Sequence, residues 1–80
     1  MLGQFGIRLR AVRIASGFPD GSLAAADLGV EAPRYRKYER GEAIPPVPVL
    51  LAICTMFNTT SDFLLFGHTE RTRAAVKDKD

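Results

Sequence analysis

The sequence predicts an all-α fold, in which five short helices form one domain over residues 1–67 and a polar tail follows over residues 68–80. Three observations predict it. Apolar residues recur at spacings of three and four, the period of an amphipathic helix. Glycine or asparagine follows each apolar segment, at the place where a left-handed residue commonly ends a helix. The 80 residues, 46% of them hydrophobic, suit one small core.

The first helix is expected over about residues 4–16, and Gly17 ends it. The second lies between the turn at residues 18–22 and Gly29. That turn offers two N-caps, Asp20 and Ser22, and the Asp20 carboxylate also suits the positive end of the helix dipole. The residues expected on the core side of these helices are Phe5, Leu9, Val12, Ile14, Leu23, Ala24, Ala25 and Leu28.

Three further helices are expected over about residues 32–40, 47–57 and 61–66. Pro33 and Pro48 fall in first turns, where the missing N–H of proline costs little. Asn58 is a plausible left-handed stop for the fourth helix, and Thr60 should cap the fifth. The expected core residues here are Val30, Tyr35, Tyr38, Leu50, Leu51, Ile53, Cys54, Phe57, Phe63, Leu64 and Phe66.

Composition argues against several classes of function. One cysteine and one histidine allow neither an internal disulfide nor a zinc site, so we expect no metal and a buried, unreactive Cys54 thiol. No apolar run approaches the roughly 18 residues of a membrane span, and the first residues do not read as a signal peptide. No carboxylate pair or phosphate-binding loop is recognisable. We therefore expect a cytoplasmic protein that is not an enzyme and has no cofactor, no small-molecule substrate and no membrane partner.

The net charge of +2 is too small to identify a nucleic-acid binder, but the cations cluster between Arg34 and Arg40. Ahead of this cluster, Ala25 lies four residues before Gly29, a spacing that lets two helices cross through a tight turn. Tyr35 and Tyr38 should then anchor the second of these helices inward, although aromatics can also stack on bases. The residues left facing outward, toward a DNA major groove, are Ala32, Pro33, Arg36 and Lys37.

These segments together resemble the Cro and phage-repressor family of helix-turn-helix proteins, the XRE type. The resemblance covers about residues 5–67. It is carried by residues 9–13 (LRAVR), 28–30 (LGV), 38–41 (YERG) and 61–67 (SDFLLFG), with Pro45 and Leu50.

The resemblance implies a regulator of transcription, a repressor, that binds double-stranded DNA as a homodimer. Arg13 and Glu39 match the positions of a partly buried ion pair. The base-facing positions match Ala32, Pro33, Arg36 and Lys37, and Arg40 matches a position near the DNA backbone. Arg34 is a further expected phosphate contact. Leu65 and Phe66 are expected at the dimer interface, because a short last helix can hardly bury all its apolar side chains.

The sequence departs from the family pattern in two places. Gly21 stands where the family often has a glutamine that braces a phosphate, and Glu31 stands where it often has a serine cap. An anionic side chain near phosphates is unfavourable unless it accepts from cytosine. These departures keep a second hypothesis open, a protein-interaction module on the same scaffold, such as an antitoxin or an adaptor.

Overall fold

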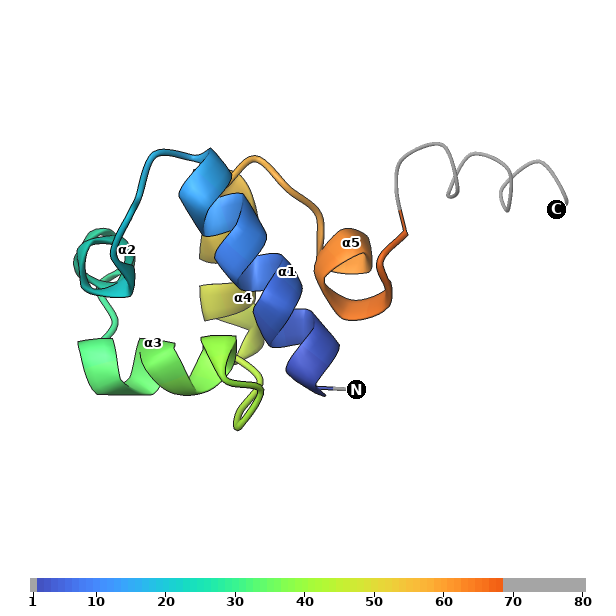
Figure 1. Ribbon diagram of the computed structural model, residues 1–80, viewed down its shortest axis with the longest axis horizontal. Coiled ribbons are helices and arrows are strands. Elements are labelled where there is room, and N and C mark those ends of the chain that lie inside the picture. The colour runs from blue at the N-terminus through green and yellow to red at the C-terminus, as the bar shows by residue number, and fades with distance from the viewer. Residues whose placement is uncertain (1, 69–80) are drawn as a thin grey trace, which may run out of the picture.

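The computed structural model describes residues 2–68, and the predicted all-α fold class is confirmed within them. The helices are α1 (Leu2–Ala15), α2 (Gly21–Leu28), α3 (Ala32–Glu39), α4 (Val47–Met56) and α5 (Ser61–Phe66), and no strand occurs between residues 2 and 68 (Figure 1). Except for His68, the predicted polar tail lies outside the described residues.

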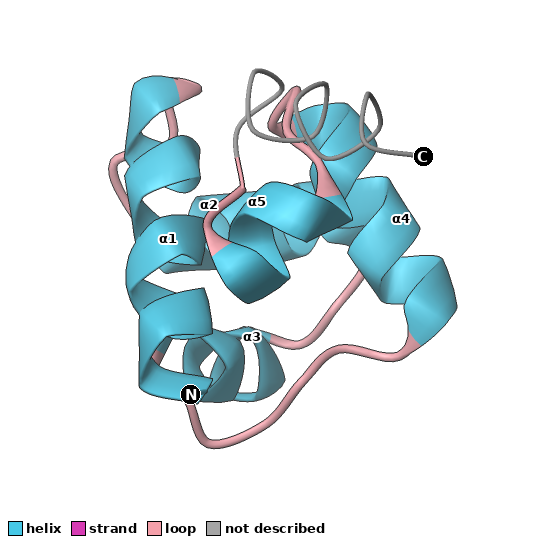
Figure 2. Ribbon diagram, turned by 90° about the vertical axis from the view of Figure 1, so that its right-hand side faces the viewer, coloured by secondary structure: helices cyan, strands magenta, loops and turns pink. Residues whose placement is uncertain are grey.

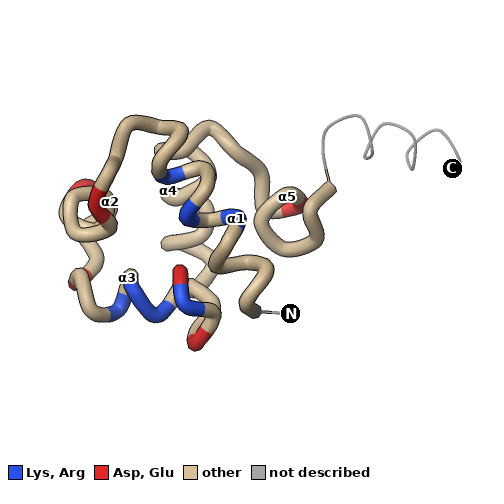
Figure 3. The backbone as a smooth tube through the Cα atoms, viewed as in Figure 1, with Lys and Arg blue, Asp and Glu red and all other residues tan. Residues whose placement is uncertain are grey.

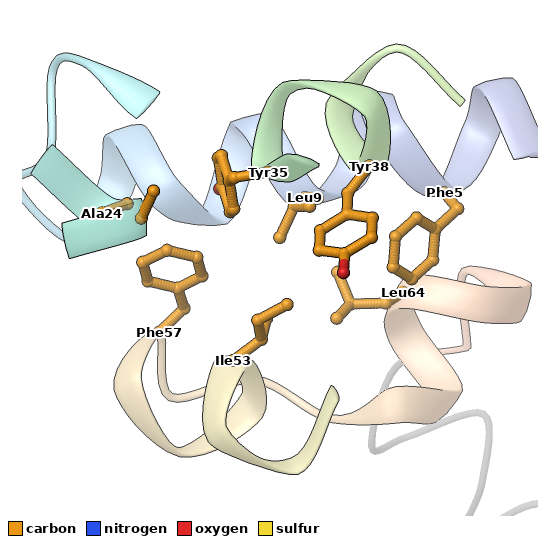
Figure 4. Packing of buried hydrophobic residues seen from close by; sticks show 9 residues of the cluster. Phe5, Leu9, Ala24, Tyr35, Tyr38, Ile53, Phe57 and Leu64 are labelled. Atoms are coloured by element: carbon orange, nitrogen blue, oxygen red, sulfur yellow. The ribbon is translucent and has the colours of Figure 1, made fainter. Parts of the chain in front are cut away.

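Helix α1 is the central element of the domain. It packs against both α3 and α5, while α2 packs against α3 and α4 (Figures 1 and 2). The space between the helices is filled by one apolar core (Figure 4). Its fully buried members are Phe5, Leu9, Ala24, Ala25, Tyr35, Tyr38, Ile53, Phe57 and Leu64.

The helix ends follow the expected capping chemistry. Asp20 is the N-cap of α2, and its Oδ1 accepts a hydrogen bond from the Ser22 backbone N–H at 2.9 Å. Thr60 caps α5, where its hydroxyl accepts from the Phe63 N–H at 3.1 Å. Asn58 has the left-handed φ of 51° expected of a helix stop. The bounds of α1, α3 and α4 differ from the predicted ones by one or two residues.

Four residues expected in the core are more than half exposed: Ile14, Leu23, Leu51 and Phe66. The reason is helical phase. Three of them lie two positions from an inward-facing residue of the same helix, and two positions rotate a side chain by about 200°. Leu23 precedes the buried Ala24 by one position and lies beside the core-facing side of α2. The apolar stripe of each helix is therefore narrower than its apolar composition suggests.

Helices α1 and α3 approach each other so closely that one position of α1 has no room for a side chain. A Cβ atom added at Gly6 would lie 2.1 Å from the Glu39 carbonyl oxygen and 3.0 Å from that of Tyr38. Both of these atoms belong to the backbone, which cannot swing aside as a side chain can. Gly6 thus sets the distance between the central helix and the helix that carries the candidate site.

Two smaller expectations can also be compared with the structure. The Cys54 thiol is half-buried against the core, and burial raises its pKa above the ordinary value, which disfavours the reactive thiolate. None of the helices in the described part of the chain is long and apolar enough to cross a membrane.

Candidate nucleic-acid interface

An ion pair fastens α3 to α1. The Arg13 guanidinium donates from Nε to Glu39 Oε2 at 2.7 Å and from Nη2 to Glu39 Oε1 at 3.2 Å. Its Nη1 donates to the Phe18 carbonyl oxygen at 2.7 Å, so the guanidinium also holds the turn before α2. The side chains of Arg13 and Glu39 are only 6% and 14% exposed. The ion pair implied by the family resemblance is present, and its bidentate geometry is the one that makes arginine–carboxylate pairs strong.

The surroundings of this pair favour its charged state. The hydrogen bonds to Glu39 raise the pKa of Arg13 further above its ordinary value, against the effect of burial. Next to it, burial raises the pKa of Tyr35 well above the ordinary value, and the Glu39 carboxylate adds to that shift. Tyr35 consequently stays neutral beside the matched pair.

A tight turn joins α2 to α3. Gly29 adopts the left-handed conformation at φ 74° and ψ 27°, and the Val30 N–H donates to the Ala25 carbonyl at 3.0 Å. Glu31 occupies the N-cap position of α3 without a side-chain capping hydrogen bond. Tyr35 and Tyr38 pack inward, with their rings edge to face at a centroid distance of 6.2 Å. The two tyrosines fix which side of α3 faces solvent.

The structure places most of the predicted contact residues on that outer side. Pro33, Arg34, Arg36, Lys37 and Arg40 are all exposed. Ala32 differs from the prediction, since it is half-buried and packs against the core. It lies three residues before Tyr35, and that spacing puts both on nearly the same side of the helix.

Positive charge in the described residues is confined to two elements. Every Lys and Arg between residues 2 and 68 lies in α1 or in α3 and its C-cap (Figure 3). No group of three or more His, Cys, Asp or Glu side chains able to hold a metal occurs in that same stretch. The site is therefore a basic, exposed helix face.

Two of the outer arginines already have partners that the sequence did not reveal. Arg36 Nη2 donates to the Ser22 hydroxyl oxygen, at the start of α2, at 2.9 Å. Arg40 Nε and Nη2 donate to Glu42 at 2.7 and 3.1 Å, and this exposed pairing lowers the pKa of the Glu42 carboxyl. The sequence indicates neither pairing, because a spacing of two residues is not a helical pairing distance and Ser22 and Arg36 belong to different helices.

The basic face is hollowed on both flanks of α3. One hollow, called here the arginine cleft, has a volume of about 330 Å³ and lies where α1, the start of α2 and α3 meet. Its lining residues are Arg10, Arg13, Gly21, Tyr35, Arg36, Glu39 and Arg40. The other, the connector hollow, has a volume of about 540 Å³ between α3 and residues 43–46 and includes Arg34 and Lys37 in its lining.

Gly21, which departs from the family pattern, lies beside the Tyr35 ring. A Cβ atom at this position would lie 3.3 and 3.4 Å from two carbons of the Tyr35 ring. A side chain there would press on the ring unless the ring moved. Arg36, reaching from α3 to Ser22, instead brings a polar group to the start of α2.

The fold and this exposed basic helix define the class of the protein. A family described as "Helix-turn-helix domain" matches residues 4–64, and the chain belongs to this family. The chain is similar to YonR of Bacillus subtilis (strain 168), named as an SPbeta prophage-derived uncharacterised HTH-type transcriptional regulator, with 35% identity over 64 residues. The match covers 80% of this chain and 58% of the relative. No solved structure matches the chain.

Proposed function

We propose that the protein is a DNA-binding regulator of transcription that lays α3 in the major groove of double-stranded DNA. The observation that carries this proposal is the exposed outer face of α3, with its cations held on a helix pinned to α1 by the Arg13–Glu39 pair. An α-helix of about 10–12 Å diameter fits the major groove, which is about 12 Å wide. The proposed DNA contacts are the exposed residues Pro33, Arg34, Arg36, Lys37 and Arg40.

The contacts divide by chemistry. Lys37 lies near the middle of the outer face and is the proposed reader of guanine acceptors. Pro33 offers apolar contact to a thymine methyl group. Arg34 and Arg40 suit phosphates, which bind cations without regard to base sequence. The name of the relative and the resemblance to phage repressors support a role in transcription, as a repressor, and a DNA-binding regulator of this kind would act in the cytoplasm.

The test is selection of bound sites from a pool of random duplexes, followed by titration of the selected and a scrambled duplex across a salt series. We expect the selected duplex to bind more tightly at every salt concentration, with affinity for both falling as salt rises. Lys37→Ala should reduce the ratio of the two affinities, whereas Arg34→Ala should weaken both about equally.

The second candidate function is a protein-interaction module on the same scaffold. The observation that favours it is the presence of a carboxylate at each end of α3. Glu31 is exposed and makes no side-chain capping hydrogen bond, and Glu42 pairs with Arg40. Failure of the wild type to bind any duplex at low salt would contradict DNA binding and support this alternative.

We also propose that the protein acts as a homodimer. Phe66 on α5 and Val47 and Leu51 on α4 are each at least 60% exposed. No charged residue occurs between Glu42 and Asp62, so this part of the surface could meet its own copy without charge repulsion. Apolar surface of this kind commonly marks an interface.

A further inference from the structure

We propose that the arginine cleft binds one phosphate group of the DNA backbone, with Arg10 and Arg36 as the two cations that clamp it. This proposal rests on the DNA binding proposed above. It adds Arg10 to the expected DNA contacts and changes the expected role of Arg36 from base reading to phosphate binding.

The charge balance of the arginine cleft identifies these two cations. Four arginines and one carboxylate line it. Arg13 is paired with Glu39 inside the cleft, and Arg40 is paired with Glu42 at its edge. Within the described residues no carboxylate pairs with Arg10 or Arg36, so two positive charges remain in one hollow. A bound anion would remove their mutual repulsion.

The geometry of Arg36 supports phosphate binding over base reading. Its hydrogen bond to Ser22 Oγ holds the guanidinium toward the start of α2, on the flank of α3 that faces α1. A guanidinium has five N–H donors, and this bond uses one of them. The neutral hydroxyl orients the arginine without cancelling its charge. Asp20, the nearby acid, is occupied as the N-cap of α2 and does not line the cleft.

The shape of the arginine cleft also suits a backbone phosphate. Gly21 contributes no side chain to its wall, and the Tyr35 ring stands beside Gly21, so the space stays open. The volume of about 330 Å³ accommodates a phosphate group together with its neighbouring sugar atoms. The cleft lies beside the outer face of α3, as a backbone contact flanking a groove-bound helix must.

The test combines protein variants with DNA in which single phosphates are made neutral. Arg10→Ala, Arg36→Ala and the double variant are titrated against the selected duplex, with Arg34→Ala as the matched control from the connector hollow. We expect each variant to lower the affinity for selected and scrambled duplexes by the same factor. The slope of log affinity against log salt concentration changes by about 0.9 for each phosphate that the protein neutralises. The slope of the double variant should therefore be shallower than that of the wild type by about 0.9, as expected for one shared phosphate.

A scan with single methylphosphonate linkages then locates the phosphate. At one position the neutral linkage should reduce the affinity of the wild type by the same factor as the Arg10→Ala/Arg36→Ala double substitution does. At that position the linkage should not reduce the affinity of the double variant any further. Arg34→Ala should still reduce the affinity for the duplex that carries the neutral linkage at that position. Unchanged thermal unfolding of each variant, followed by circular dichroism, is the folding control, since Arg10 and Arg36 are exposed.

Titration with inorganic phosphate tests anion binding in the arginine cleft independently of DNA binding. We expect amide shifts at Gly21 and Ser22 that are absent in the double variant. If the wild type binds no duplex but shows these Arg10-dependent shifts, the DNA function fails and the cleft binds a free anion. If the wild type binds DNA but no methylphosphonate position behaves as described, or Arg36→Ala changes the ratio of the two affinities, the phosphate clamp is wrong and the DNA function stands.

Discussion

Arg13 has its charge buried at the junction of α1, α3 and the turn before α2, where it donates to both carboxylate oxygens of Glu39 and to the Phe18 carbonyl oxygen. Loss of one member of such a pair leaves the other charge buried and unpaired. We expect Arg13→Ala and Glu39→Ala each to lower the free energy of unfolding by about 3 kcal/mol. Urea denaturation of the single and double variants measures this, and the double variant should lose less than the sum of the singles. Additive losses would show that the pair is not a unit.

Gly6 tests how closely α1 and α3 must approach. Gly6→Ala places a Cβ against two backbone carbonyls, so we expect a loss of about 2 kcal/mol or more, typical of severe overpacking. Gly3→Ala is the matched control, because no atom lies within 4 Å of the added Cβ on the same helix. It should be neutral or stabilising by up to about 1 kcal/mol, since alanine favours helix. Thermal unfolding of the two variants should therefore shift in opposite directions, and equal shifts would contradict the close contact.

Single residues are where prediction from sequence was least complete. The Arg13–Glu39 pair was implied by the family resemblance and is present. The roles of Gly6 and Ser22 could not be predicted, because each depends on a neighbour from another helix. A helical glycine looks like a weak helix former until the backbone that lies against it is known.

At the scale of elements, helix ends were predictable because their signals are local. A cap acts on backbone groups within three residues, so Asp20 and Thr60 could be identified from the sequence. The side of each helix that is buried depends on phase relative to distant partners. Leu51 and Phe66 both lie in apolar runs of the sequence, and composition does not show that these members of the runs point outward.

The cap of α5 gives a prediction for this scale. Thr60→Ala removes the acceptor for the Phe63 N–H and should cost about 1 kcal/mol, as is typical for such caps. Thr60→Asn keeps an acceptor at the same place and should recover most of the loss. Chemical denaturation of the three proteins is the measurement, and equal stability of the alanine and asparagine variants would show that the hydroxyl does not stabilise the helix.

At the scale of the whole molecule, charge and apolar surface are separated along the chain. The cations of the described residues lie on α1 and on α3 with its C-cap, while no charge occurs from residue 43 to residue 61. The exposed side chains of Val47 and Leu51 belong to this uncharged stretch, whereas Phe66 lies on α5, where Arg8 of α1 donates a hydrogen bond to the Leu64 carbonyl oxygen. Such a division suits a protein that contacts DNA with one surface and its own copy with another.

The proposed dimer can be tested by placing charge on that apolar surface. Phe66→Glu or Leu51→Glu should convert a dimer to a monomer in sedimentation equilibrium, because two like charges would face each other across a two-fold axis. Ile7→Glu on α1, a residue as exposed as these two, is the control and should leave the dimer intact. In DNA binding the monomeric variants should keep affinity for a half-site but lose the gain from a second half-site about 34 Å away. A wild type that remains monomeric at high concentration would contradict the dimer. A dimer broken only by Ile7→Glu would show that the interface lies elsewhere.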